Sequence, residues 1–274
     1  MKKGWISYPY MIWMIIFIIV PLILVLYYSL TATVDDTVIF SLDNFARVFQ
    51  PTYLKVLWRS IALALVSTMI CLLLGYPVAM ILSGRDLSKK STLVMLFVIP
   101  MWMNFLLRTY AWMTLLDRKG VINSILGMLG LPQVNILYTD YAVILGMVYN
   151  FLPFMVLPIF SVLSKIDKSL IEAAEDLGSD SITVFRRVVF PLSLPGVVSG
   201  ITMVFMPAVT TFIISKLLGG SQYMLIGNLI ETQFMRAYDW NFGSALSIIM
   251  MLLILASMGI MSRYDKEEAG GGLF

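Results

Sequence analysis

The residues of this chain that could carry chemistry gather in one polar segment, 164–195, which reads SKIDKSLIEAAEDLGSDSITVFRRVVFPLSLP. Ser169 and Glu172 have the S-x-x-E spacing of a capping box, which predicts a helix with Ser169 as its N-cap. The helix should run through Leu177 and end at Gly178, because glycine suits the position just beyond a helix. The segment therefore offers charged side chains on a short helix, which is chemistry for recognition.

Three acidic side chains of this helix stand at positions i, i+3 and i+4 and should share one face: Glu172, Glu175 and Asp176. Ala173 and Ala174 leave a flank without bulk, so another surface can approach closely. Beyond a turn at 178–180, a second short helix should carry Arg186 and Arg187 towards the membrane surface before Pro191. The residues alone leave two interpretations open: a solvated linker, or a rigid helix-turn-helix that docks into a groove on a soluble partner.

Residues for catalysis or metal binding are scarce. The chain has no histidine, which removes the commonest general base and the commonest metal ligand. Its single cysteine, Cys71, lies in an apolar stretch, where we expect it to serve packing. No G-x-x-x-x-G-K-S/T motif is present, so we expect no nucleotide, cofactor or metal on this chain, and a membrane enzyme is disfavoured. The net charge of +3, with basic residues in loops, does not indicate a nucleic-acid partner.

The elements that must position these residues are membrane helices. Of the 274 residues, 59% are apolar and 13% are charged, whereas soluble domains have about 45–50% and about 25%. Six largely uncharged stretches are long enough to cross a hydrocarbon core of about 30 Å: 4–34, 60–84, 91–107 with an apolar continuation to 116, 141–164, 188–215 and 240–262. The sequence therefore predicts an all-α, multi-spanning protein with about six transmembrane helices, the first of them a retained signal anchor.

Orientation follows from the distribution of Lys and Arg between the loops. Eleven lie at the termini and in the second and fourth loops, against seven in the alternate loops, which places both termini in the cytoplasm. Arg108 falls within the third span, where we expect it to reach the outer interface or to pair with a carboxylate of an external loop. In the loop 117–140, apolar residues at helical spacing predict a short helix that either lies over the pore mouth or rests on lipid.

The polar segment also resembles a known motif. Glu172-Ala173-Ala174, Gly178 and the run 188–191 match the EAA loop of ABC-importer permeases, EAA-x3-G-x9-I-x-L-P, with Val188 and Phe190 as conservative departures. In that family the loop is a coupling helix that sits in a cleft of the ATP-hydrolysing subunit. The resemblance thus implies a coupling set made up of Glu172, Ala173, Ala174, Glu175, Asp176, Gly178 and Pro191.

The resemblance further implies the type I ABC importer permease fold and a division of the chain. Residues 1–58 would form an N-terminal transmembrane helix and external loop. Residues 59–264 would form the permease domain, with the coupling helix near 166–190, and 265–274 a short cytoplasmic tail. The location implied is the bacterial cytoplasmic (inner) membrane.

Other stretches, among them LDNFARVF, LGYPVAMIL and NFLLRTYAW, resemble the permease subunits of spermidine/putrescine importers in this family. This implies two ATP-binding subunits that hold ATP and magnesium, a second homologous permease, an external substrate-binding protein and membrane lipid as partners. Import of another small solute and, less readily, ion-coupled secondary transport are the alternatives. The latter usually involves inverted repeats with interrupted helices, and we see none in the sequence.

A polyamine is a flexible polycation, so its path should offer carboxylates and aromatic faces. The candidates in or near the spans are Trp102, Asn104, Tyr110, Trp112, Tyr149, Asn150, Glu231, Tyr238 and Asp239. For each aromatic residue the competing interpretation is packing or interfacial anchoring. For Glu231 and Asp239 it is an ordinary solvated loop charge.

Overall fold

The computed structural model describes residues 8–34, 37–84, 87–220 and 223–270, and most of them are helical. The predicted beginning of the first span at Gly4 and the end of the tail, 271–274, lie outside the described residues. Five helices are long and apolar enough to cross a membrane: Tyr8–Ser29, Pro51–Ser83, Asp140–Leu163, Ser181–Thr210 and Trp240–Met261. The all-α, multi-spanning prediction is therefore confirmed.

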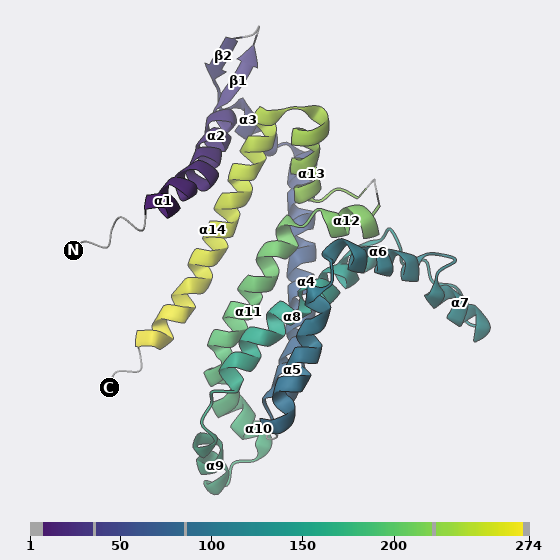
Figure 1. Cartoon of the computed structure of the whole chain (residues 1–274), viewed down its shortest axis with the longest axis vertical. Helices are drawn as coiled ribbons and strands as arrows, with labels where there is room; N and C mark the ends of the chain where they lie inside the picture. The colour runs from purple at the N-terminus through teal and green to yellow at the C-terminus, as the bar shows by residue number, and fades with distance from the viewer. Residues whose placement is uncertain (1–7, 35–36, 85–86, 221–222, 271–274) are drawn as a thin grey trace.

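The third predicted span is a broken helix. Helix α5 (Leu87–Trp102) ends before Asn104, whose side chain accepts hydrogen bonds from the backbone N–H groups of Leu106 and Leu107 at 2.8 and 3.3 Å. A side chain that caps these N–H groups starts a new helix, and α6 (Phe105–Leu116) leaves in another direction (Figure 1). Arg108 therefore lies in α6 and not in one continuous span.

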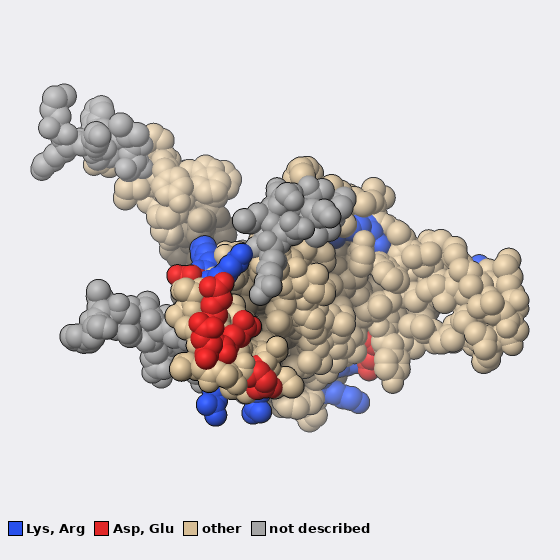
Figure 2. Space-filling view, turned by 90° about the horizontal axis from the view of Figure 1, so that it is seen from below, with Lys and Arg blue, Asp and Glu red and all other residues tan. Residues whose placement is uncertain are grey.

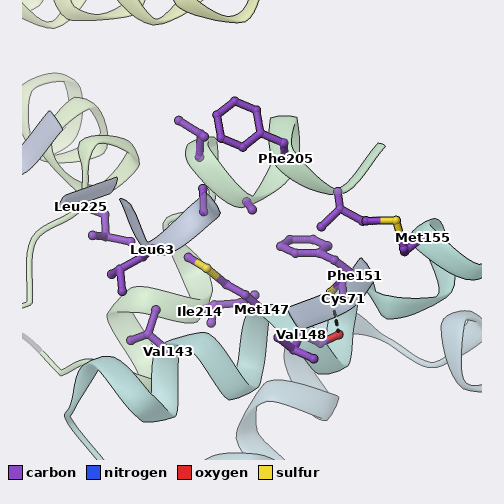
Figure 3. Packing of buried hydrophobic residues seen from close by; sticks show 14 of the residues in the cluster. Leu63, Cys71, Val143, Met147, Val148, Phe151, Met155, Phe205, Ile214 and Leu225 are labelled. Atoms are coloured by element: carbon purple, nitrogen blue, oxygen red, sulfur yellow. Dashed lines mark hydrogen bonds between the residues drawn. The ribbon is translucent and has the colours of Figure 1, made fainter. Parts of the chain in front are cut away.

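The centre of the bundle is formed by α4 (Pro51–Ser83), α8 (Asp140–Leu163) and α11 (Phe190–Thr210), which pack against one another along their lengths. Figure 3 shows apolar side chains from these helices filling the space between them. Cys71 is fully buried there and its thiol donates a weak hydrogen bond to the Val148 carbonyl at 3.8 Å, so its predicted packing role is confirmed.

The first helix lies at the side of this bundle. It consists of α1 (Tyr8–Met14), a π-turn η2 (Ile15–Ile19) and α2 (Val20–Ser29), and α2 packs on α14 (Trp240–Gly270) (Figure 1). Asn241 ties the two together, because its amide donates to the carbonyls of Tyr28 and Thr31 at 3.1 and 2.6 Å. Most of the apolar side chains on this helix are exposed, which suits a surface in contact with lipid or with a further subunit.

The predicted first span continued to residue 34, and here the expectation was wrong. The helix ends at Ser29 and an antiparallel hairpin follows, with β1 (Thr31–Val34) paired to β2 (Thr37–Phe40) in the register Thr31 to Phe40. Three of these eight strand residues are valine or isoleucine and three are threonine, and these β-branched types favour extended backbone. Short helix α3 (Asp43–Val48) leads from the hairpin to α4.

The fifth predicted span also differs. Helix α10 (Ser181–Val184), the π-turn η3 (Phe185–Val189) and α11 form one continuous helix, so the second short helix expected before Pro191 is not separate. Pro191 has no N–H to donate, and the wider π-turn directly before it accommodates the lost hydrogen bond. The same sequence of π-turn and proline occurs at η2 and Pro21.

The long helix ends at Thr210, five residues before the predicted boundary at 215. Two short helices follow, α12 (Ile213–Leu218) and α13 (Ile226–Thr232), and a π-turn η4 (Gln233–Ala237) leads to α14. Two other short helices complete the fold: α7 (Val121–Met128) after α6, and α9 (Lys168–Asp176) between α8 and α10. In Figure 1, α9 and α10 lie at one end of the bundle, and α12 and α13 lie towards the other.

Candidate functional site

Helix α9 begins at a different residue from the predicted one. Asp167 is its N-cap and its Oδ1 accepts a hydrogen bond from the Ser169 N–H at 3.0 Å, so Ser169 lies inside the helix and the capping-box expectation was wrong. A carboxylate is a good N-cap and is also stabilised by the helix dipole. The hydrogen bonds from Ser169 hold the pKa of Asp167 below its usual range.

The end of α9 is the predicted one. Gly178 has φ +82°, its N–H donates to the Glu175 carbonyl at 2.8 Å, and the Ser179 N–H donates to the Ala174 carbonyl at 3.1 Å. These two bonds form a Schellman motif, which requires the left-handed conformation that glycine adopts without strain. Both ends of α9 are therefore fixed by hydrogen bonds.

The next helical turn is fixed as well. The Thr183 hydroxyl donates to Asp180 Oδ1 at 2.5 Å and lowers the pKa of that carboxyl, and the Val184 N–H donates to the Asp180 carbonyl at 3.0 Å. From Asp180 the helix runs without interruption into α11. The loop that contains α9 is thus joined directly to a helix of 30 residues, Ser181–Thr210, which is about 45 Å long.

The surface of this loop is acidic and partly apolar. Figure 2 looks onto this end of the molecule and shows acidic side chains gathered in one area. Glu172, Glu175 and Asp176 are all exposed, as their spacing predicted. Leu177 and Ile182 are 88% and 68% exposed at the turn, a feature that the sequence reasoning missed. Large exposed apolar side chains beside acidic ones are typical of a surface that another protein covers.

The other members of the predicted coupling set differ in their surroundings. Ala173 is exposed, Ala174 is partly buried, and Pro191 lies in the first turn of α11, partly buried. Glu172 also lines a cavity of about 450 Å³ between α9 and the ends of α4 and α8, together with Lys168, Ile171 and Val189. The set is therefore divided between the exposed surface of α9 and the first turn of α11.

The candidate path residues do not line one common cavity of the described chain. Trp102 and Tyr238 are 77% and 74% exposed, and Tyr110 is exposed to a lesser degree. Trp112 and Tyr149 pack edge to face with ring centroids 5.3 Å apart. Asn104 caps α6, as described above.

Asn150 is buried and its amide donates to the Gly146 carbonyl at 2.8 Å, while its Oδ1 has no partner among the described residues. A buried oxygen without a partner is unusual in a folded protein.

Both candidate carboxylates are ion-paired. Glu231 Oε1 lies 2.6 Å from Lys216 Nζ, and Asp239 Oδ2 lies 2.9 Å from Arg47 Nη1. Asp239 Oδ1 also accepts from the Phe242 N–H at 3.0 Å, at the start of α14. Neither ion pair was predicted from the sequence; Arg47 and Asp239, for example, stand 192 positions apart.

Arg108 does not have the predicted carboxylate partner. The residue is 9% exposed, its Nε has no hydrogen-bond partner, and within the described ranges no ion pair reaches it. Arg108 is thus a buried residue of α6 whose Nε donor is unpaired among the described residues.

The predicted helix in the loop 117–140 is confirmed as α7. Asn123 closes this loop, because its amide donates to the Val134 carbonyl at 3.0 Å and its Oδ1 accepts from the Val134 N–H at 2.8 Å. Figure 1 shows α7 beyond α6, away from the bundle, so it does not lie over the central helices of this chain.

Comparison with known proteins decides the family. Residues 1–267 match the family model described as "Binding-protein-dependent transport system inner membrane component". The chain belongs to this family. It is a multi-pass membrane component of a transport system.

Relatives of this transport component carry substrate names. The chain is 39% identical over 254 residues to the spermidine/putrescine transport system permease protein PotB of Escherichia coli (strain K12), with 91% of each chain covered. It is also 39% identical over 260 residues to the protein of the same name from Haemophilus influenzae, with 93% of this chain and 91% of that one covered.

The fold of this transport component is that of a solved importer subunit. The structure titled bacterial alginate ABC transporter in complex with alginate pentasaccharide-bound periplasmic protein contains a chain that superposes with a TM-score of 0.81 at 16% identity. The alignment covers 99% of this chain and 98% of that one, so the type I importer permease fold extends over the whole described length.

Proposed function

We propose that the chain is a permease subunit of an ATP-driven importer of polyamines such as spermidine and putrescine. The observation that carries the proposal is 39% identity, over 91% of the chain, to a spermidine/putrescine permease, in a chain whose EAA loop folds as a capped helix joined to a long core helix. Two ATP-binding subunits, a second homologous permease and an external substrate-binding protein complete the proposed transporter. ATP and magnesium bind only to the ATP-binding subunits.

The geometry of the loop supports its role in coupling. A coupling element has to be stiff, exposed and attached to a moving part. The N-cap at Asp167 and the Schellman motif at Gly178 make α9 stiff, and its acidic and apolar side chains are exposed. The continuous helix Ser181–Thr210 then connects the loop to α12 at the far end of the bundle.

The proposed orientation puts the 164–195 loop and both termini in the cytoplasm, where ATP-binding subunits are found. The bias of Lys and Arg between the loops supports it. With this orientation, α12, α13 and the hairpin β1–β2 face outwards and meet the substrate-binding protein.

The test is uptake by the assembled transporter. Membrane vesicles that contain the chain with its three partner subunits and the external binding protein are given ATP and labelled spermidine or putrescine. We expect ATP-dependent uptake of both labelled polyamines. Unlabelled polyamine should inhibit this uptake by competition. Uptake that responds only to an uncharged sugar or an amino acid contradicts the polyamine assignment, and uptake driven by an ion gradient without ATP contradicts the importer class.

A further inference from the structure

A cavity of about 380 Å³ lies where the end of α11 meets α13 and α14, and its volume is typical of sites for small ligands, which have about 300–1,000 Å³. Its walls are almost entirely apolar, with the side chains of Phe212, Ile226, Ile230, Phe234, Met235 and Met250. Gly227 allows the close approach that shapes it, because a Cβ there would lie 2.5 Å from the Thr210 carbonyl oxygen. Among the described residues of the lining, Glu231 is the one that ionises.

Glu231 is already occupied by an ammonium group of the same chain. Lys216 Nζ lies 2.6 Å from Glu231 Oε1, and the two side chains are 43% and 26% exposed. Lys216 belongs to α12 and lines a second cavity of about 650 Å³ together with Met113, Tyr138 and Tyr223. The ion pair therefore links the linings of the two cavities.

The ion pair does not itself hold α12 against α13. Asn228 does so, because its Oδ1 accepts from the Ser215 hydroxyl at 2.5 Å and its amide donates to the Phe212 carbonyl at 2.8 Å. The backbone of α13 is also held from α4, where Ser60 Oγ accepts from the Ile226 N–H at 2.8 Å. The Lys216 side chain can therefore leave Glu231 while both helices stay in place.

The lysine side chain has four methylene groups and a primary ammonium, which is the structure of one end of an alkyl diamine. We propose that Glu231 and the apolar cavity form a subsite for an alkylammonium group and its methylene chain, and that Lys216 is a built-in occupant which the substrate displaces. The inference rests on the proposed import of polyamines and adds to it a site and an exchange step.

The physical chemistry of the exchange suits transport. One ammonium replaces another on the same carboxylate, so Glu231 stays paired, and the displaced Lys216 ammonium is solvated because its side chain is 43% exposed. Partly exposed ion pairs contribute about 0–1 kcal/mol, so the site can release what it binds. The cavity includes Thr210, the last residue of α11, and the partial negative charge at the carboxyl end of a helix adds to the attraction for a cation.

The test measures binding of radiolabelled putrescine to the complex purified through a tag on this chain, without the external binding protein. Lys216→Met removes the competing ammonium and should tighten binding about 3- to 5-fold, the equivalent of one partly exposed ion pair. Glu231→Gln should weaken binding by a similar factor, and the double variant should behave as Glu231→Gln does. Asp140→Asn is the matched control, since its ion pair with Arg59 at 2.8 Å has similar exposure and lies outside this cavity.

Two further measurements separate the possible failures. Butylammonium and hexylammonium should displace the label better than methylammonium, because longer chains bury more methylene groups. Equal displacement by all three overturns the apolar part of the subsite and indicates that lipid or the second permease fills the cavity. Weaker binding in both Lys216→Met and Glu231→Gln overturns the exchange and makes the ion pair structural.

The outcome for the proposed function is independent of these results. A wild-type complex that takes up no polyamine with its binding protein contradicts the function. Normal polyamine uptake with no difference in binding between the Lys216→Met, Glu231→Gln and Asp140→Asn complexes contradicts the subsite alone. If Glu231→Gln fails to assemble, Lys216→Met decides, because misfolding does not produce a gain of affinity.

Discussion

The hydroxyl groups of Tyr76 and Ser193 form a hydrogen bond of 2.8 Å inside the bundle and join α4 to α11. The Ser193 proton is used in a bond of 2.8 Å to the Phe190 carbonyl, so Tyr76 is the donor to Ser193. The Tyr76 ring also packs against Phe185 and Phe190, with centroids 5.9 and 6.0 Å away. The first turns of the helix Ser181–Thr210, which follows the coupling loop, are thus held against α4 by one hydrogen bond and two aromatic contacts.

This contact predicts an order of stabilities. Ser193→Ala leaves the buried Tyr76 hydroxyl without a partner and should cost about 1–3 kcal/mol. Tyr76→Phe removes the donor and leaves the Ser193 hydroxyl bonded to the Phe190 carbonyl, so it should cost about 0.5–1.5 kcal/mol. Thermal unfolding of the purified complex in detergent measures the order. Wild-type stability in both variants would show that the bond is dispensable.

The coupling loop predicts a contrast at Gly178. Gly178→Val forces a β-branched residue into φ +82° and should disrupt the end of α9, whereas Gly178→Asn should be tolerated because asparagine adopts the left-handed conformation more readily. We expect ATP-dependent uptake to fall at least about tenfold in the valine variant, equivalent to about 1.4 kcal/mol, and to stay within about twofold of wild type in the asparagine variant.

Assembly provides the control for that contrast. The valine variant should still insert into the membrane, since no atom of the described residues, apart from the glycine and its two neighbours in the chain, lies within 4 Å of a Cβ built at Gly178. Glu172→Lys should give the same separation of insertion from coupling, because it places a cation on the acidic face. Normal uptake by both variants would contradict the proposal that the loop docks on a partner subunit.

Topology gives a prediction that is independent of transport. A reporter fused after Arg187 should be cytoplasmic, and one inserted near Gln133 should be external. The reason is the excess of Lys and Arg in the loops on the side of the termini. Labelling of introduced cysteines by a membrane-impermeant reagent measures both positions, and reversal of both contradicts the orientation and the coupling proposal with it.

The sequence predicted those features that depend on neighbouring residues. Long apolar runs identified the spans, and the glycine after Leu177 identified the end of α9. The errors arose where two nearby residues could play the same local role or a polar residue interrupted an apolar run. Asp167, and not Ser169 two residues away, is the N-cap of α9, and Asn104 starts a new helix inside an apolar run.

Features that depend on distant residues were not accessible from the sequence. Lys216 and Glu231 stand 15 positions apart on different helices, and neither their ion pair nor the apolar cavity beside it has a local pattern. The same holds for Arg47 and Asp239, which meet only because α3 packs on α14.

The two candidate carboxylates therefore predict different outcomes. Asp239 is part of the framework: it pairs with Arg47, whose guanidinium lies 4.1 Å from the Phe242 ring centroid, and it accepts from the Phe242 N–H. Asp239→Asn keeps an acceptor for that N–H and loses only a partly exposed ion pair, which contributes about 0–1 kcal/mol. Spermidine uptake should stay within about twofold of wild type, while Glu231→Gln lowers it about 3- to 5-fold. Uptake of labelled spermidine, set against ATP hydrolysis stimulated by the binding protein in the same vesicles, measures the difference. A larger loss from Asp239→Asn than from Glu231→Gln would place the substrate beside Arg47 and α14 instead of at the cavity of α13.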